Sequence, residues 1–142
     1  MSEQYEDLNQ VYYRDYYQFP TRSKWMEKVW SEAFGDEYPT GLDHYGYVTR
    51  HDLAVFAERL DLVAGSALLD IGCGKGGPGL WLAERLQAKL TGIDIIPEAV
   101  DHANRFKHQF DLGYPAEFEV GEFYKIPLRD QSRDAVISFD SL

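Results

Sequence analysis

Two acidic residues and the glycine-rich run between them are the groups in this chain whose types and spacing could do chemistry. Asp70 ends a short apolar run, Gly72 and Gly74 follow it, and Asp94 ends a second apolar run further along. Glycines are needed where the backbone turns tightly or passes close to a ligand, because a Cβ would clash there. A helix that starts after such a turn offers unpaired N–H groups to that ligand. An acid at the end of the second strand can accept hydrogen bonds from both ribose hydroxyls. The pattern therefore predicts a loop that binds a nucleoside cofactor.

The glycine spacing has more than one interpretation. Gly72, Gly74 and Gly77 satisfy G-x-G-x-x-G, the pattern of dinucleotide-binding proteins. Asp70 counts against a dinucleotide, because a carboxylate repels a pyrophosphate but attracts an ammonium or a sulfonium group. The fuller run Asp-x-Gly-x-Gly-x-Gly, which ends at Gly76, resembles motif I of the class I S-adenosylmethionine (SAM) methyltransferases. A structural strand–turn–helix without any ligand is the remaining interpretation.

Composition excludes several other classes of protein. The 142 residues fit one domain, and the net charge of −10 with scattered basic residues disfavours a nucleic-acid partner. No apolar run approaches the roughly 20 residues of a membrane helix, so no membrane partner is expected. The single cysteine, Cys73, fits a reducing compartment, and we expect a cytoplasmic protein. The four histidines lack metal-ligand spacing, so no metal is predicted and each histidine is expected at the surface.

Strands and helices alternate from residue 67 onward. Alternation of this kind indicates an α/β fold with a doubly wound parallel sheet and right-handed crossovers. Ligands of such sheets bind at the carboxyl ends of the strands, where Asp70, Asp94 and Asp140 fall. The predicted strands cover residues 67–71, 89–94, 117–120 and 134–139, and the predicted helices between them cover 78–86 and 97–110.

The first fifty residues are predicted to form a helical, aromatic-rich cap (1–50) on a cofactor-binding core (51–142). A four-residue recurrence of apolar side chains predicts a helix from Ser23 to Phe34. Thr49 and Asp52 have the spacing of a capping box ahead of a helix over 51–62. Residues 36–46 are expected to be a loop, and the whole cap to be mobile over the cofactor. Eight of the ten tyrosines lie here: Tyr5, Tyr12, Tyr13, Tyr16, Tyr17, Tyr38, Tyr45 and Tyr47.

From Thr49 to Leu142 the chain is similar to small-molecule methyltransferases of the class I family. The resemblance implies a Rossmann-like sheet, SAM as cofactor, S-adenosylhomocysteine (SAH) as its product, and a small-molecule acceptor. In that family the motif I acid and glycines surround the methionine part of SAM, and the second-strand acid binds the ribose. Ile95 would flank the adenine, and Glu122 would meet its amino group. Phe123 would lie beside the adenine ring, although a core position is an equal alternative. The predicted cofactor-binding residues are Asp70, Gly72, Cys73, Gly74, Gly76, Gly77, Asp94, Ile95, Glu122, Phe123 and Asp140, with Tyr47 and Thr49 from the cap.

Two departures from the family pattern bear on function. Ser138-Phe139-Asp140-Ser141 stands where an Asn-Pro-Pro or Asp-Pro-Pro tetrad would, which argues against methylation of nucleobase or glutamine amino nitrogens. Only the 3-2-1-4 half of the family's seven-stranded sheet is encoded, so the C-terminal strands are expected to be missing. The fourth strand would then be an exposed edge through which two copies could pair.

The predicted function is SAM-dependent methyl transfer to a small-molecule acceptor. No catalytic base is predicted, since His44, in the loop that could cover the site, is expected at the surface. A noncatalytic SAM-binding fragment is the first alternative, and a nicotinamide-dinucleotide-binding oxidoreductase domain is the second.

Overall fold

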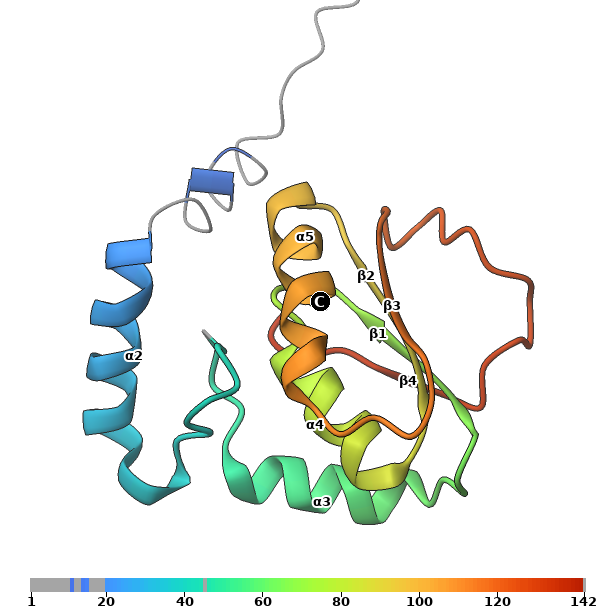
Figure 1. Ribbon diagram of the computed structural model, residues 1–142, viewed down its shortest axis with the longest axis horizontal. Helices are drawn as coiled ribbons and strands as arrows, with labels where there is room; N and C mark the ends of the chain where they lie inside the picture. Colours follow the sequence, from blue (N-terminus) through green and yellow to red (C-terminus); the bar gives the residue numbers. More distant parts are fainter. Residues whose placement is uncertain (1–10, 12–13, 16–19, 45, 142) are drawn as a thin grey trace, which may run out of the picture.

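A four-stranded parallel sheet organises the chain (Figure 1). The computed structural model describes residues 11, 14–15, 20–44 and 46–141. The strand order is β3-β2-β1-β4, and every neighbouring pair is parallel. This confirms the predicted Rossmann-like fold and the order 3-2-1-4. The strands are β1 (Ala67–Ile71), β2 (Lys89–Asp94), β3 (Ala116–Val120) and β4 (Ala135–Ile137).

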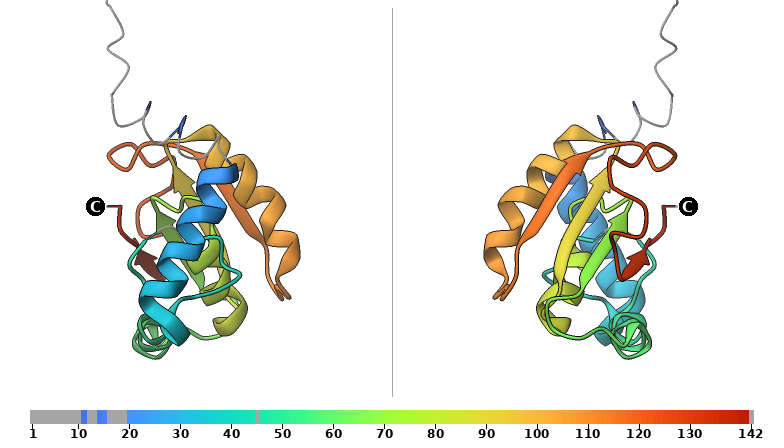
Figure 2. Two further views of the ribbon diagram at one scale, coloured as in Figure 1. Left: turned by 90° about the vertical axis from the view of Figure 1, so that its left-hand side faces the viewer. Right: turned by 90° about the vertical axis from the view of Figure 1, so that its right-hand side faces the viewer.

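Two crossover helices cover one face of the sheet. Helix α4 (Gly77–Leu86) connects β1 to β2, and α5 (Pro97–Phe106) connects β2 to β3, continuing into a 3-10 turn, η2 (Lys107–Gln109). Each helix has a proline in its first turn, where the missing N–H costs nothing. Right-handed crossovers that step in the same direction along a sheet put their helices on the same face, as Figure 2 shows. The core lies between this face and the helices.

The buried core is apolar and continuous across these layers. Leu68 of β1 and Leu90 of β2 are 0% and 2% exposed, and Leu80 of α4 is 0% exposed. Phe118 of β3 and Ala103 of α5 belong to the same cluster. Burial of such side chains contributes about 1.5–3 kcal/mol each, so this layer holds the strand ends at fixed positions.

The fourth strand is shorter than predicted, because side chains replace ladder hydrogen bonds at both of its ends. Before the strand, Oδ2 of Asp134 accepts a hydrogen bond from the N–H of Ala67 at 2.7 Å. After it, the hydroxyl of Ser138 donates to the carbonyl of Ile71 at 2.9 Å. The helix predicted over 97–110 likewise ends early, at Phe106, and the 3-10 turn carries the chain on.

The segment before the core consists of two helices joined by a loop. Helix α2 (Pro20–Phe34) and a 3-10 turn, η1 (Gly35–Glu37), lead into the loop, and α3 (Arg50–Leu60) follows it. The predicted capping box is confirmed, since the Thr49 hydroxyl accepts from the N–H of Asp52 and the Asp52 carboxylate accepts from the N–H of Thr49. Helix α3 ends before residue 62, because Asp61 is left-handed with a φ of 46°. Tyr5, Tyr12, Tyr13, Tyr16, Tyr17 and Tyr45, which were predicted to belong to the cap, lie outside the described residues.

The loop between η1 and α3 packs onto the core. Its residues Leu42 and Val48 are buried in the same apolar cluster as the strands and helices of the sheet. The division into residues 1–50 and 51–142 stays a prediction. Within the described part of the chain, none of the helices has the length and apolar character needed to cross a membrane.

Candidate active site

The glycine loop after β1 adopts the sharp turn that its sequence predicts. Gly72, Gly74 and Gly76 have φ angles of 69°, 52° and 86°, in the left-handed region that favours glycine. The N–H groups of Gly72 and Cys73 both donate to the carbonyl of Ile93 on β2, at 2.8 and 3.1 Å. The loop is therefore fixed to the carboxyl end of the neighbouring strand.

Asp94, at the end of β2, braces this loop. Its Oδ2 accepts a hydrogen bond from the N–H of Gly74 at 2.7 Å, and its Oδ1 accepts one from the N–H of Ile96 at 2.9 Å. Burial raises the pKa of Asp94, and the hydrogen bonds from Ile96 and Gly74 oppose that rise. Each carboxylate oxygen retains a second lone pair, so these bonds leave it able to accept from ribose hydroxyls. The ribose contact stays a prediction.

Asp70 lies behind the loop rather than on its surface. Its side chain is 2% exposed, and among the described residues its Oδ1 has no hydrogen-bond partner. Its Oδ2 lies against Gly79 of α4, where a Cβ would overlap that oxygen. Burial, and then the charge of Asp94, raise the pKa of Asp70 to about 8. A buried carboxyl with no counter-charge is stabilised in its ionised form by a cation brought close to it, which fits a ligand that carries an ammonium group.

Cys73 has no nucleophilic role in this setting. Burial raises the pKa of its thiol well above the ordinary value, and the charges of Asp70 and Asp94 add to the rise. The protonated thiol is a poor nucleophile. Its cofactor contact stays a prediction for a small residue of the loop.

Two exposed apolar side chains follow the carboxyl ends of β2 and β3. Ile95 follows β2 and is 36% exposed, and Phe123 follows β3 and is 63% exposed, so the alternative of a core position for Phe123 is wrong. The two strand ends are joined, because the N–H of Gly121 donates to the carbonyl of Asp94 at 2.9 Å. Glu122 lies at this corner, where a side-chain hydrogen bond with it raises the pKa of Tyr124. An adenine contact by this group stays a prediction.

An ion pair connects the loop before α3 to the glycine loop. The ammonium of Lys75 lies 3.3 Å from both carboxylate oxygens of Asp43, and Nε2 of His102 on α5 lies 2.8 Å from Oδ2 of Asp43. Burial alone would raise the pKa of Asp43, but the contacts with His102 and Lys75 outweigh it and hold the pKa at about 2. The carbonyl of Leu42 also lies where a Cβ on Gly77 would be.

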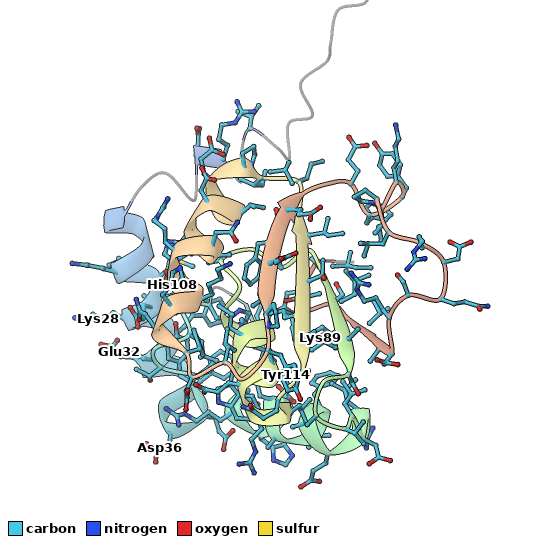
Figure 3. The ribbon with its side chains drawn as sticks, turned by 45° about the vertical axis from the view of Figure 1, so that its right-hand side comes forward. Lys28, Glu32, Asp36, Lys89, His108 and Tyr114 are labelled. Carbon is cyan, nitrogen blue, oxygen red and sulfur yellow. The ribbon has the colours of Figure 1, made fainter. Side chains whose placement is uncertain are left out.

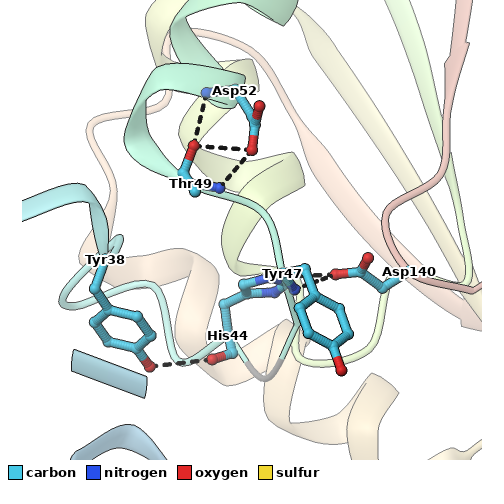
Figure 4. Close-up of polar contacts among 6 residues, drawn as sticks. All are labelled: Tyr38, His44, Tyr47, Thr49, Asp52 and Asp140. Carbon is cyan, nitrogen blue, oxygen red and sulfur yellow. Dashed lines mark hydrogen bonds and ion pairs between the residues drawn. The ribbon is translucent and has the colours of Figure 1, made fainter. Parts of the chain in front are cut away.

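The same loop meets the end of β4 at Asp140 (Figure 4). The N–H of Tyr47 donates to Oδ2 of Asp140 at 2.6 Å, and Nε2 of His44 lies 3.8 Å from that oxygen. The side chain of His44 is only 10% exposed, so its predicted surface position is wrong. Burial lowers the pKa of His44 to about 4, against the opposing charge of Asp140. No sequence pattern indicated this pairing, because the two residues lie almost a hundred positions apart.

The other two cap residues of the predicted site have different surroundings. The Tyr47 ring is 67% exposed and meets the Trp30 ring of α2 edge-on, with centroids 5.1 Å apart. The Thr49 hydroxyl is engaged in the capping box of α3, at 2.8 Å from the Asp52 carboxylate. Cofactor contacts by both stay predictions. Among the described residues, no cluster of histidine, cysteine and acidic side chains could hold a metal ion.

A second surface feature lies at the amino ends of the strands, opposite the candidate site. A surface hollow there is lined by Lys89, Thr91 and Arg133, and Figure 3 shows Lys89 and Tyr114 near that end. Arg133 is tied to Thr91 by a hydrogen bond of 3.0 Å. This hollow shares no lining residue with the candidate site at the carboxyl ends of the strands.

Comparisons with known proteins bear on the family to which the chain belongs. A methyltransferase domain model matches residues 68–142. The 27-O-demethylrifamycin SV methyltransferase of Amycolatopsis mediterranei is 37% identical over 86 residues, which cover 61% of this chain and 32% of that protein. A sterol 24-C-methyltransferase of Gibberella zeae is 30% identical over 129 residues, which cover 90% of this chain and 33% of that protein.

A solved structure extends the likeness to three dimensions. The SAM-dependent methyltransferase from Thiobacillus denitrificans, in complex with SAH, is 26% identical with a TM-score of 0.55, over 63% of this chain and 36% of that one. The chain spans about a third of the length of the curated relatives above. Since the domain model matches more than half of the chain, the protein belongs to the methyltransferase domain family, and the resemblance predicted from its glycine loop is confirmed.

Proposed function

We propose that the chain binds SAM at the carboxyl ends of β1, β2 and β3 and serves the transfer of its methyl group to a small-molecule acceptor. One observation carries this proposal: the buried Asp70 carboxyl, whose Oδ1 has no hydrogen-bond partner among the described residues, lies behind a loop of left-handed glycines that accepts support from Asp94. A cationic nucleoside satisfies both acids at once, through its ammonium group and its ribose hydroxyls. The relative from Thiobacillus denitrificans, which holds SAH, supports the assignment.

The residues of the site would bind and orient the two reactants. SAM supplies a methyl group that its positively charged sulfur already activates. Asp94 and the glycine loop would fix the nucleoside, and Asp70 would favour the cationic end through its field. The loop of residues 38–49 would exclude water from the edge. Holding two reactants in line in this way lowers the barrier without a covalent step on the protein.

A small-molecule acceptor is supported by the charge of the chain and by its relatives. The net charge of −10 disfavours nucleic acid, and the printed names of the two relatives concern a rifamycin and a sterol. The single cysteine supports a cytoplasmic location. Pairing of two copies through the outer edge of β4 is part of the same proposal, since β4 pairs with β1 alone among the described strands.

Calorimetry of SAH binding to the wild type and to Asp94→Ala tests the assignment. The variant removes the ribose acceptor, and charge-assisted hydrogen bonds contribute about 1.5–3 kcal/mol each, so we expect the affinity to fall at least about tenfold. Asp101→Asn, which changes an exposed acid on α5, is the matched control and should bind as the wild type does. Unchanged SAH affinity in a folded Asp94→Ala protein would refute the assignment.

Two further measurements address the alternatives. Binding of NADH in place of SAH would favour the oxidoreductase interpretation. SAH binding without transfer of radiolabelled methyl to any acceptor in a cell extract would favour a noncatalytic module.

A further inference from the structure

Lys75 places a positive charge in the loop that would bind a positively charged ligand. It lies between Gly74 and Gly76, and its side chain is only 9% exposed. SAM carries two positive charges, on its ammonium and its sulfonium, against one carboxylate. A lysine in the loop opposes the binding of SAM, because like charges repel strongly in a site that is only partly solvated. The charge of Lys75 therefore has to be offset.

Asp43, in the loop before α3, supplies the opposite charge. Both of its carboxylate oxygens lie 3.3 Å from Nζ of Lys75. Oδ2 of Asp43 also lies 2.8 Å from Nε2 of His102 on α5. Burial opposes ionisation of Asp43, but these contacts outweigh it and hold its pKa at about 2. Its carboxylate is therefore ionised at neutral pH and lies against the positive charge of the glycine loop.

The chain around Asp43 is docked on the core, which fixes this contact. Leu42, the preceding residue, is buried in the apolar cluster, and its carbonyl lies where a Cβ on Gly77 would be. Val48, later in the same loop, is buried in that cluster as well. The ion pair between Asp43 and Lys75 therefore depends on the docking of the loop.

The other charged groups of the glycine loop are acids. Oδ2 of Asp94 accepts a hydrogen bond from the N–H of Gly74 at 2.7 Å, and Asp70 lies buried behind the loop. With Lys75 offset by Asp43, the charge that a ligand meets at the glycine loop is negative. The affinity then depends on the charge of the ligand, which differs between SAM and SAH because methyl transfer removes the sulfonium charge.

We propose that Asp43 is a specificity-determining residue: by offsetting the charge of Lys75, it makes the site prefer the sulfonium of SAM to the neutral thioether of SAH. This inference rests on the proposed function and names what separates cofactor from product at that same site. Docking of the loop and binding of SAM would favour one another, since a coupling between two equilibria is reciprocal. Loss of the sulfonium charge would weaken that coupling and favour release of SAH.

Calorimetry of SAM and SAH binding to charge variants, with no acceptor present, tests the proposal. The measured quantity is the dissociation constant of SAH divided by that of SAM, in which effects common to both ligands cancel. Asp43→Asn should lower this ratio about three- to tenfold, because the charge of Lys75 is then no longer offset by a carboxylate. Lys75→Met should raise the ratio by a similar factor, since the charge of Asp43 then acts alone on the glycine loop. The double variant should return it close to the wild-type value.

The substitutions are matched to their positions. Asp43 has a φ of 50°, and asparagine adopts this left-handed region more readily than most residues. Glu32→Gln is the control, because it removes a negative charge from the exposed face of α2, where Glu32 lies 3.9 Å from Lys28 (both labelled in Figure 3). The control should leave the ratio at the wild-type value.

An unchanged ratio in either single variant would overturn the inference. In Lys75→Met, equal loss of affinity for both ligands is such a result, because it assigns Lys75 to the carboxylate that SAM and SAH share. If Asp43→Asn does not fold, Lys75→Met still decides the question. If the ratio is unchanged while both ligands bind the wild type, the proposed function stands; failure of the wild type to bind either ligand would overturn both.

Discussion

The buried Asp70 carboxyl predicts that ligand binding releases a proton. With a pKa of about 8, this carboxyl is protonated in about 90% of the unliganded molecules at pH 7. A ligand ammonium near the loop favours the ionised form and lowers the pKa of Asp70. If the pKa falls below about 6, binding at pH 7 releases about 0.9 proton per molecule.

The affinity for SAH should depend on pH through the same ionisation of Asp70. Because the bound state prefers the ionised carboxyl, SAH affinity should rise with pH between the bound and the free pKa values, by up to tenfold per pH unit. It should level off above pH 8, where Asp70 is ionised in both states. Across pH 6 to 8 the gain is therefore up to about 50-fold, or about 2.3 kcal/mol.

Calorimetry in two buffers of different ionisation enthalpy measures the proton release directly. Asp70→Asn should abolish both the release and the rise of affinity with pH, because the amide does not titrate. Asp94→Asn should weaken binding but retain the release, and Asp101→Asn should change neither. Binding of SAH without proton release, or release that persists in Asp70→Asn, would refute the argument.

Three further outcomes are expected. Thr49→Ala should lower the free energy of unfolding by about 1 kcal/mol in urea titrations, because it removes the cap of α3, whereas Thr49→Ser should be neutral; equal loss in both would contradict the capping role. Hydrogen exchange should show residues 38–44 and 46–48 more protected when SAH is bound while β1 and β2 change little; the same protection with and without SAH would count against a mobile cap. Light scattering at high protein concentration should detect self-association that Val136→Lys reduces, since Val136 is 56% exposed on β4; a monomeric wild type would contradict pairing through this strand.

The core of the fold was predictable because local sequence and tertiary structure agree there. The apolar runs that end at Asp70 and Asp94 are strands, and Pro78 and Pro97 lie in the first turns of the helices that follow them. The right-handed crossover rule then leaves few arrangements of such units. The errors were at ends of elements, as at residue 134 and residue 138, where side chains take hydrogen bonds that a ladder would otherwise make.

The glycine loop was predictable for a related reason, since the glycines that its backbone conformation requires lie close together in the sequence. Gly72, Gly74 and Gly76 need left-handed backbone within one turn, and only glycine adopts it freely. The burial of Asp70 was not readable, because it depends on how α4 packs back over β1 at Gly79. The loop's chemistry could thus be named from the sequence, but the electrostatics of its acid could not.

The position of His44 shows why the loop before α3 was harder to predict than the glycine loop. In the sequence His44 is one polar residue in a loop without periodicity, and nothing near it indicates burial. Its environment is made by contacts of long sequence separation: Asp43 with Lys75, and the N–H of Tyr47 with Asp140. Each of these is a single polar contact whose partner could have been any of many charged residues. Such contacts are specified by the way the loop docks on the core and not by a local sequence pattern, so the sequence of the loop alone did not indicate them.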